Sequence, residues 1–337
     1  MPEQLAALIL AAGKGVRMKS ALPKVLHPIL GRPMIRYVID TVKTVGAQQV
    51  TTVVGFGKDT LIAALQGLDL AFVEQAPQLG TGHAVQCFAK QFPQAPEHLM
   101  IVCGDTPLLS QETLKVMVDE HLQKRHALTM MTLNMAEPGG YGRILRDGKG
   151  RVKAVREAKD CTPEEKLIHE VNMAVYLFHG PSLFERLFKL TNTNRQNEYY
   201  LTDLVELFYA DGLSISAIVE KDEASTLGIN SRQDMAKVSG ILQRRILEQH
   251  MANGVTIVDP AQTLIEPDVQ VGADSLILPG TLLSGKTSIG AESTIGPQAH
   301  IHDSTLGKGT KAGFCVIEKT VVGDGAHIKP FTHLSGK

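Results

Sequence analysis

The sequence has few cysteines, no long apolar run and no excess of charge of one sign. No apolar run approaches the ~20 residues needed to cross a bilayer, and the start Met1-Pro-Glu-Gln lacks the basic segment of a secretion signal. The four cysteines show no C-x-x-C spacing, which argues against a zinc site or a disulfide framework: Cys87, Cys103, Cys161 and Cys315. We therefore expect a reduced, cytoplasmic protein without a membrane partner.

The charge is balanced, with 34 basic and 35 acidic residues and a net charge of −1. Such a balance gives no sign of a polyanion-binding surface, so nucleic acid is a poor candidate partner. The length of 337 residues is enough for roughly two domains, each with a buried core.

The most informative stretch runs from Leu5 to Lys24. The uninterrupted apolar run Leu5–Leu10 predicts a strand buried on both faces, as in a parallel sheet. Gly13 and Gly15 follow, and glycines can turn successive N–H groups toward one anion. Four cations lie in the same segment, more than one phosphate needs: Lys14, Arg17, Lys19 and Lys24. The stretch indicates a triphosphate-binding loop.

Two familiar glycine patterns do not fit this loop. The third glycine of a dinucleotide-binding turn is missing, and no G-x-x-x-x-G-K-[ST] occurs in the sequence. On spacing alone, a glycine-containing turn after an edge strand, with ordinary surface cations, stays open as an alternative.

Strands and helices alternate after this loop. Apolar strands are predicted at 50–54, 70–75 and 99–103, with helices between them. This order predicts right-handed crossovers and a mostly parallel, doubly wound α/β sheet of the Rossmann-like kind.

Residues 75–84 form the next notable loop. Gln75 ends a strand and offers both a donor and an acceptor to a base edge. Gly80-Thr81-Gly82 would let backbone groups approach a flat base closely. A surface turn with a helix cap is the alternative from these residues alone. We interpret His83 as a structural histidine at a helix start rather than as a catalytic base.

Asp105 follows the strand at 99–103, at the sheet edge where parallel sheets bind ligands. Gly104 before it would leave space for a ligand. A carboxylate is a good Mg²⁺ ligand, because Mg²⁺ prefers hard oxygen donors. The alternative, an Asp that caps a helix, is weakened because Ser110 already serves as a cap.

The residues of 5–24 resemble the signature of sugar-phosphate nucleotidyltransferases: an apolar strand, A-A-G-x-G-x-R-M and then P-K, with Val16 where Thr is usual. Residues 75–84 resemble the family's Q-x-x-x-x-G-T-x-H-A element. Further motifs resemble the bacterial N-acetylglucosamine-1-phosphate uridylyltransferases: Y-G-R-I at 141–144, E-x-K-D at 157–160, a strand Asn at 172, and E-Y-Y-x-T-D at 198–203. By itself, the stretch around Tyr141 would be a hairpin turn.

This resemblance implies a reaction and the residues that carry it. UTP and N-acetylglucosamine-1-phosphate would give UDP-N-acetylglucosamine and pyrophosphate, with Mg²⁺ held by Asp105 and Asn230. The implied catalytic residues are Arg17, Lys24 and Asp105. The implied nucleotide-binding residues are Leu10, Ala12, Gly13, Gly15, Lys24, Gln75, Gly80 and Thr81. The implied sugar-binding residues are Gly142, Glu157, Asn172, Tyr200 and Thr202.

The pattern changes at Ile265. Aliphatic residues recur every six positions from there to Ile301, then slip in phase to Leu306 and Ala312, and slip again to Val316, Val322, Ile328 and Leu334. A period of six predicts a parallel β-helix of roughly four coils. We expect a nucleotidyltransferase domain at 1–230, a connecting helix at 231–254 and a short β-helix at 255–337. In the resembled family this β-helix is left-handed and assembles homotrimers.

The resembled enzymes also acetylate glucosamine-1-phosphate, through segments H-V-G-N-F-V-E and N-Y-D-G. Neither occurs in this sequence, so we expect no acetyltransferase activity. Other possibilities are a nucleotidyltransferase for glucose-1-phosphate or dTTP, and a non-catalytic sugar-nucleotide sensor. The β-helix alone would also suggest an acyltransferase, but the catalytic segments of such an enzyme are absent from this sequence.

Overall fold

The apolar run at the start of the chain forms β1 (Leu5–Leu10), whose first five residues are buried. A computed structural model describes residues 4–336 of the protein. It contains two compact units, one of residues 4–27 and 33–232, the other of residues 28–32 and 233–336. The sequence pattern gave no sign that residues 28–32 belong with the second unit.

In the first unit, β1 is hydrogen-bonded to β4 (Gln49–Val54) and to β6 (His98–Cys103), parallel to both. The sheet has the order β11-β7-β10-β6-β1-β4-β5. Its remaining strands are β5 (Ala71–Glu74), β7 (Leu128–Asn134), β10 (Glu170–His179) and β11 (Ile215–Glu220). Only β10 in this order runs antiparallel to its neighbours, so the predicted doubly wound, mostly parallel sheet is confirmed.

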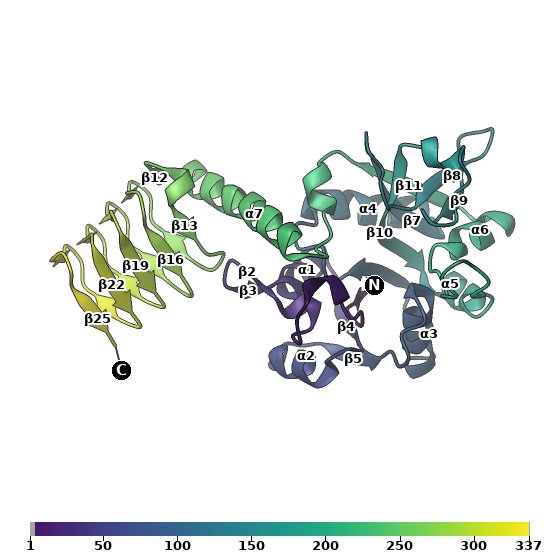
Figure 1. Ribbon diagram of the computed structural model, residues 1–337, viewed down its shortest axis with the longest axis horizontal. Helices are drawn as coiled ribbons and strands as arrows, with labels where there is room; N and C mark the ends of the chain where they lie inside the picture. Colours follow the sequence, from purple (N-terminus) through teal and green to yellow (C-terminus); the bar gives the residue numbers. More distant parts are fainter. Residues whose placement is uncertain (1–3, 337) are drawn as a thin grey trace. The chain divides into compact units, whose positions relative to one another are not determined.

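Helices cover both faces of this sheet (Figure 1). On one face α1 (Met34–Thr44) and α4 (Gln111–Lys124) contact each other, and α4 begins at Ser110, whose hydroxyl caps it as predicted. On the other face α5 (Gly180–Leu187) contacts both α3 (Thr81–Gln91) and α6 (Asp203–Ala210). The short α2 (Lys58–Ala64) contacts β4. Both faces of the central strands are therefore buried, which explains their continuous apolar sequences.

The hairpin β8 (Arg143–Arg146) and β9 (Val152–Arg156) extends the sheet beside β10. The β10–β7 pairing shifts register between Asn172 and Tyr176, and Ala174 within this irregularity has φ of 54°. A bulge re-aims the side chains next to it. Here it lets Asn172 and Tyr176 hydrogen-bond to each other.

The second unit contains a β-helix. After α7 (Arg232–Ala252), short strands stack as three parallel sheets. The sheets are β12-β15-β18-β21-β24, β13-β16-β19-β22-β25 and β14-β17-β20-β23. Their strands are Thr256–Ile257, Leu264–Ile265, Gln270–Val271, Leu276–Ile277, Leu282–Ser284, Ser288–Ile289, Thr294–Ile295, Ala299–His302, Thr305–Leu306, Lys311–Ala312, Cys315–Glu318, Val321–Val322, His327–Ile328 and His333–Ser335. The predicted short left-handed β-helix is confirmed.

One position predicted for its interior is wrong. Val316 is 38% exposed, whereas its neighbour Ile317 is fully buried. Ile317 pairs with Ile301 in the coil before and with Leu334 in the coil after. Val316 and Ile317 are adjacent aliphatic residues, and only one of them can point into the coil. The six-residue pattern was therefore continued from Val316, one residue too early.

This correction leads to a stability prediction. Ile317→Ala should destabilise the β-helix by about 2–5 kcal/mol, since it leaves a cavity in a closed coil. Val316→Ala should change stability by no more than about 0.5 kcal/mol, because its side chain is partly in solvent. Urea unfolding of the two variants measures the difference. Equal destabilisation would contradict the assignment of Ile317 to the interior.

Buried hydroxyls mark the corners of the β-helix. Thr281, Thr287 and Thr310 donate to carbonyls three residues earlier, at 2.6–2.7 Å. The hydroxyls also accept hydrogen bonds from the next coil: Ser275 Oγ from the N–H of Ser293, and Ser293 Oγ from the N–H of Thr310. These buried hydroxyls are thus satisfied partly within their own coil and partly by the coil next to it.

No helix in the part of the chain that the structure describes is long and apolar enough to cross a membrane. The four cysteines are free thiols.

Candidate functional site

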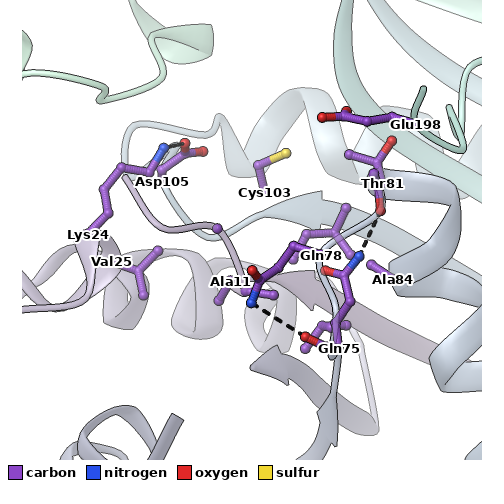
Figure 2. A pocket seen from close by; sticks show the side chains of 15 residues that line it. Ala11, Lys24, Val25, Gln75, Gln78, Thr81, Ala84, Cys103, Asp105 and Glu198 are labelled. Carbon is purple, nitrogen blue, oxygen red and sulfur yellow. Dashed lines mark hydrogen bonds and ion pairs between the residues drawn. The ribbon is translucent and has the colours of Figure 1, made fainter. Parts of the chain in front are cut away.

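A cavity of about 280 Å³ opens at the carboxyl ends of β1, β5 and β6 (Figure 2). Parallel sheets bind ligands at this edge. Its lining includes most of the residues predicted for the nucleotide: Leu10, Ala12, Gly13, Lys24, Gln75, Gly80 and Thr81. Asp105 lines it too, beside Lys24 (Figure 2).

Gly15 does not line the cavity but shapes its rim. It has φ of 57°, in the left-handed region, and a Cβ there would lie 2.7 Å from Cβ of Lys24. Only glycine combines this backbone conformation with this close contact. Gly15 therefore lets the lysine side chain pack against the turn and reach the cavity.

Lys24 connects the two residues predicted to hold a metal. Its ammonium forms an ion pair with the Asp105 carboxylate, and the two side chains are 15% and 20% exposed. The same ammonium donates to Oδ1 of Asn230 at 3.3 Å. Residues 24, 105 and 230, far apart in the chain, thus meet at one point beside the glycine loop.

The donor set fits a divalent cation. Asp105 and Asn230 present a carboxylate oxygen and an amide oxygen to one shared cationic group, and both are hard donors of the kind that divalent ions prefer. Among the described residues no group of three or more His, Cys, Asp or Glu could hold a metal by itself. A cation here would therefore need further oxygens from substrate phosphates or water.

Arg17 does not line the cavity. It is exposed in a short 3₁₀ turn at Val16–Met18, next to Val16, which is 73% exposed. The structure places the predicted arginine near the glycine loop in sequence but not on the cavity wall, so its catalytic role stays a prediction.

Gly104 does not leave space for a ligand, contrary to the expectation. A Cβ there would lie 3.3 Å from Ile9, from the Leu10 carbonyl and from Val25. Its N–H donates to that Leu10 carbonyl at 2.9 Å. The glycine lets β6 end tightly against β1, and this packing is what positions Asp105.

Gly80 and Gly82 pack against the chain's own backbone, while their predicted approach to a base stays a prediction. A Cβ on either would lie within 3 Å of the Tyr199 carbonyl oxygen, to which the Gly82 N–H donates at 2.7 Å. The hydroxyl of Thr81 accepts from the N–H of Leu201 at 3.1 Å. These residues join the loop at 79–82 to the segment at 198–201, which leads into the predicted sugar-binding residues.

The predicted sugar-binding residues gather around Glu157. The Thr202 hydroxyl donates to its carboxylate at 2.9 Å, and a Cβ on Gly142 would lie 3.7 Å from its other oxygen. Gly142 in turn accepts a backbone hydrogen bond from Asn172 at 2.8 Å. The Tyr200 hydroxyl lies 3.2 Å from Asp160 and accepts from Gln196. All five predicted residues therefore lie in one region, joined partly by hydrogen bonds and partly by packing.

This region concentrates half-buried acidic groups. Burial raises the pKa of Glu157, and the carboxylates of Asp160 and Glu198 raise it further, while the Thr202 hydroxyl lowers it. Burial likewise raises the pKa of Asp203 to about 6. Carboxylates in such a place are suited to accept hydrogen bonds from neutral hydroxyl groups.

Tyr176 is a buried neighbour of the predicted sugar-binding residues. Its hydroxyl accepts from the Asn172 amide at 2.7 Å. Burial raises the pKa of its phenol, and the nearby carboxylate of Glu157 adds to that rise. The segment that carries Tyr200 and Thr202 borders the cavity, because Glu198 lines it and the hydroxyl of Thr81, another lining residue, accepts from the N–H of Leu201.

Several cavity residues were missed by the sequence reasoning: Gln78, Cys103 and Glu198. Burial raises the pKa of Cys103 to about 12, so its thiol is neutral. The position of Cys103 at the last residue of β6 could have identified it, because it directly precedes Gly104-Asp105. Glu198 could have been identified as the first residue of the E-Y-Y-x-T-D motif at 198–203, of which only Tyr200 and Thr202 were predicted to belong to the site.

Comparisons with known proteins agree with this geometry. A sequence-family model described as MobA-like NTP transferase domain matches residues 7–198. The bifunctional protein GlmU of Geobacillus sp. (strain WCH70) is 43% identical over 328 residues, covering 97% of this chain and 71% of that protein. The chain belongs to the GlmU family. Another GlmU protein, from Fervidobacterium nodosum, is 44% identical over 327 residues, covering 97% of this chain and 70% of its own length.

Solved structures confirm the fold outside close relatives of GlmU. Apo UDP-glucose pyrophosphorylase superposes with a TM-score of 0.58 at 20% identity, over 72% of this chain and 99% of that one. A protein from Bacillus anthracis, described as a glucose-1-phosphate thymidylyltransferase, superposes with a TM-score of 0.57 at 14% identity, over 70% of this chain and 94% of that one. The sequence-based assignment to the bacterial uridylyltransferases is confirmed for the family, and the chain is an enzyme of the GlmU family.

Proposed function

We propose that this enzyme transfers UMP from UTP to N-acetylglucosamine-1-phosphate, with Mg²⁺ as cofactor, and releases pyrophosphate. The observation that carries the proposal is the meeting of Lys24, Asp105 and Asn230 at the glycine loop. This arrangement supplies a cation and two metal-ligating oxygens where two phosphates must approach each other. The predicted sugar-binding region around Glu157 borders the cavity through the segment at 198–202, which supports the proposal.

The chain's residues act mainly by position and charge. The sugar phosphate is already ionised, so its oxygen can attack the α-phosphorus without a general base, and pyrophosphate leaves in line. Lys24 would neutralise charge on the triphosphate, assisted by backbone N–H groups at Gly13 and Gly15. Asp105 and Asn230 would hold Mg²⁺, which supplies Lewis-acid activation and a template for the two phosphates.

The test is an assay of pyrophosphate release with UTP, Mg²⁺ and N-acetylglucosamine-1-phosphate. Parallel reactions replace the sugar phosphate by glucose-1-phosphate, or UTP by dTTP. The proposed pair should give the highest kcat/KM. Faster reaction with another pair would assign another substrate, and no release with any pair would favour a non-catalytic binding protein.

Glu157 provides a more specific prediction. Glu157→Gln should raise KM for the sugar phosphate about 10- to 100-fold, since it removes a charged acceptor worth about 1.5–3 kcal/mol. KM for UTP should stay within about twofold. Steady-state kinetics with each substrate varied in turn measures both values. Glu137→Gln, at an exposed loop position, is the matched control and should leave both unchanged.

Three further features belong to the proposal. We expect residues 1–337 alone not to acetylate glucosamine-1-phosphate, because the segments that carry acetyl transfer in the resembled enzymes are absent from this sequence. We also propose a homotrimer assembled through the β-helix, which light scattering on the purified protein would test. We propose a cytoplasmic location, which cell fractionation would test.

A further inference from the structure

Gln75 directly follows β5 and lines the cavity with a side chain that is almost fully buried. Its amide nitrogen donates to the Gly80 carbonyl at 2.8 Å, shown as a dashed line in Figure 2, and lies 3.3 Å from Nδ1 of His83. A carbonyl oxygen can only accept, so the atom that faces Gly80 must be the amide nitrogen. The orientation of the Gln75 amide is therefore determined by its surroundings.

His83 lies on α3 and faces the second hydrogen of this amide. A neutral imidazole protonated at Nε2 has a lone pair at Nδ1 and can accept that hydrogen. Burial lowers the pKa of His83, and the charge of Lys90 lowers it further, whereas a hydrogen bond to the Pro77 carbonyl acts in the opposite direction. The imidazole is thus kept neutral, and its Nδ1 is assigned as the acceptor because the Gln75 amide nitrogen that faces it can only donate.

With both amide hydrogens used, Gln75 has only its side-chain oxygen left. Within residues 4–336 no protein donor lies within hydrogen-bond distance of this oxygen, and the side chain borders the cavity. Gln75 therefore offers the cavity an acceptor and no donor.

An acceptor at this point distinguishes the pyrimidine bases. The ring nitrogen N3 of uracil carries a hydrogen and donates, whereas N3 of cytosine carries a lone pair. The Gln75 oxygen attracts the first and repels the second. Such a mismatch weakens binding, because a polar group that has lost its contact with water is left unpaired.

We propose that His83 is a positioning residue which fixes the Gln75 amide as an acceptor, so that the cavity selects nucleotides whose base carries a ring N–H. The inference rests on the proposed function, in which Gln75 faces the base of UTP. His83 itself need not touch the nucleotide. It changes the sequence-based interpretation of His83 from a purely structural residue to one that sets base preference.

Calorimetric binding of UTP and of CTP, without sugar phosphate, tests the proposal. Wild type should bind UTP more tightly. His83→Phe keeps a ring beside Tyr199, 6.3 Å away between centroids, but has no acceptor. It should reduce the ratio of the two Kd values about threefold to tenfold, the effect of one net hydrogen bond. His83→Asn places an amide oxygen near the position of Nδ1 and should keep most of the wild-type ratio.

A purely structural role would weaken both nucleotides equally, and an unchanged ratio in His83→Phe would overturn the proposal. The proposal would also be overturned if the wild-type protein bound CTP as tightly as UTP, or if it bound neither nucleotide. If His83→Phe does not fold, His83→Leu gives the same comparison. Because binding is measured without turnover, a shifted ratio together with absent pyrophosphate release would contradict the proposed reaction and leave the role of His83 intact.

Discussion

Replacing Asp105 with asparagine should lower kcat at least about 100- to 1000-fold and leave the fold intact. The carboxylate forms the ion pair with Lys24 and is one of two oxygen donors that meet there. Asparagine keeps the shape and an oxygen that Lys24 can contact, but loses the negative charge. Losing one electrostatic group aimed at reacting charge typically costs this much in kcat.

Pyrophosphate release and circular dichroism of the purified variant measure the two parts of this prediction. Asp119→Asn is the matched control, because Asp119 lies on the exposed side of α4 in a long ion pair with Lys115. Calorimetric titration with Mg²⁺ should show weaker Mg²⁺ binding in Asp105→Asn than in wild type, and unchanged binding in Asp119→Asn. Turnover within tenfold of wild type would be incompatible with a catalytic role for Asp105.

The second large effect is on stability. Gly180→Ala should destabilise the first unit by about 3 kcal/mol or more, because its Cβ would lie 1.8 Å from the Pro96 carbonyl oxygen. The Gly180 N–H also donates to the Glu97 carbonyl at 2.9 Å, which holds the two backbone segments together. Alanine would favour the helix at this position by about 1 kcal/mol. The clash with a backbone atom outweighs that gain.

Thermal unfolding checks this prediction. A loss of about 3 kcal/mol corresponds to a fall in Tm of roughly 6–12 °C for a unit of this size. Gly148→Ala is the matched control, since Gly148 lies in a turn where an added methyl group would meet no atom within 4 Å. Equal Tm values for the two variants would show that Pro96 can move aside without cost.

The sequence predicted most of the framework, because two of its patterns are strong. The apolar run at Leu5–Leu10 has no polar residue to place on a surface, so it must be a buried strand. The six-residue period after Ile265 fits neither a helix nor an alternating strand. Both predictions depend only on which side chains are buried, and the positions of apolar residues in the sequence indicate this directly.

The roles of the glycines were harder to predict. Gly104 was interpreted as space for a ligand, and Gly80 and Gly82 as points where the backbone approaches a base, but what lies at each Cβ position is the chain's own backbone or a neighbouring side chain. A glycine in a sequence indicates that another group packs closely against the backbone, but it does not identify that group. Only the tertiary structure identifies Tyr199 as the neighbour of Gly80 and Gly82.

The candidate site was predicted in part. Asp105 and Asn230 lie in different segments, and their meeting at Lys24 depends on how β6 and the segment after β11 end at the same sheet edge. The family resemblance suggested that meeting, since the spacing of the two residues contains no such information. The bond between Gln75 and His83 could not be predicted, because it depends on the rotamers of two side chains on different elements.

The stacked hydroxyls of the β-helix have a consequence for how this unit can vary in length. The Ser293 hydroxyl accepts from the N–H of Thr310 in the next coil, and the Ser293 N–H donates to the Ser275 hydroxyl in the coil before. These hydrogen bonds therefore join each coil to its immediate neighbours and to no coil further away. Free energy in such an array is a sum of nearest-neighbour contributions. Evolution can therefore add or delete whole turns of the solenoid without redesigning the ones that remain.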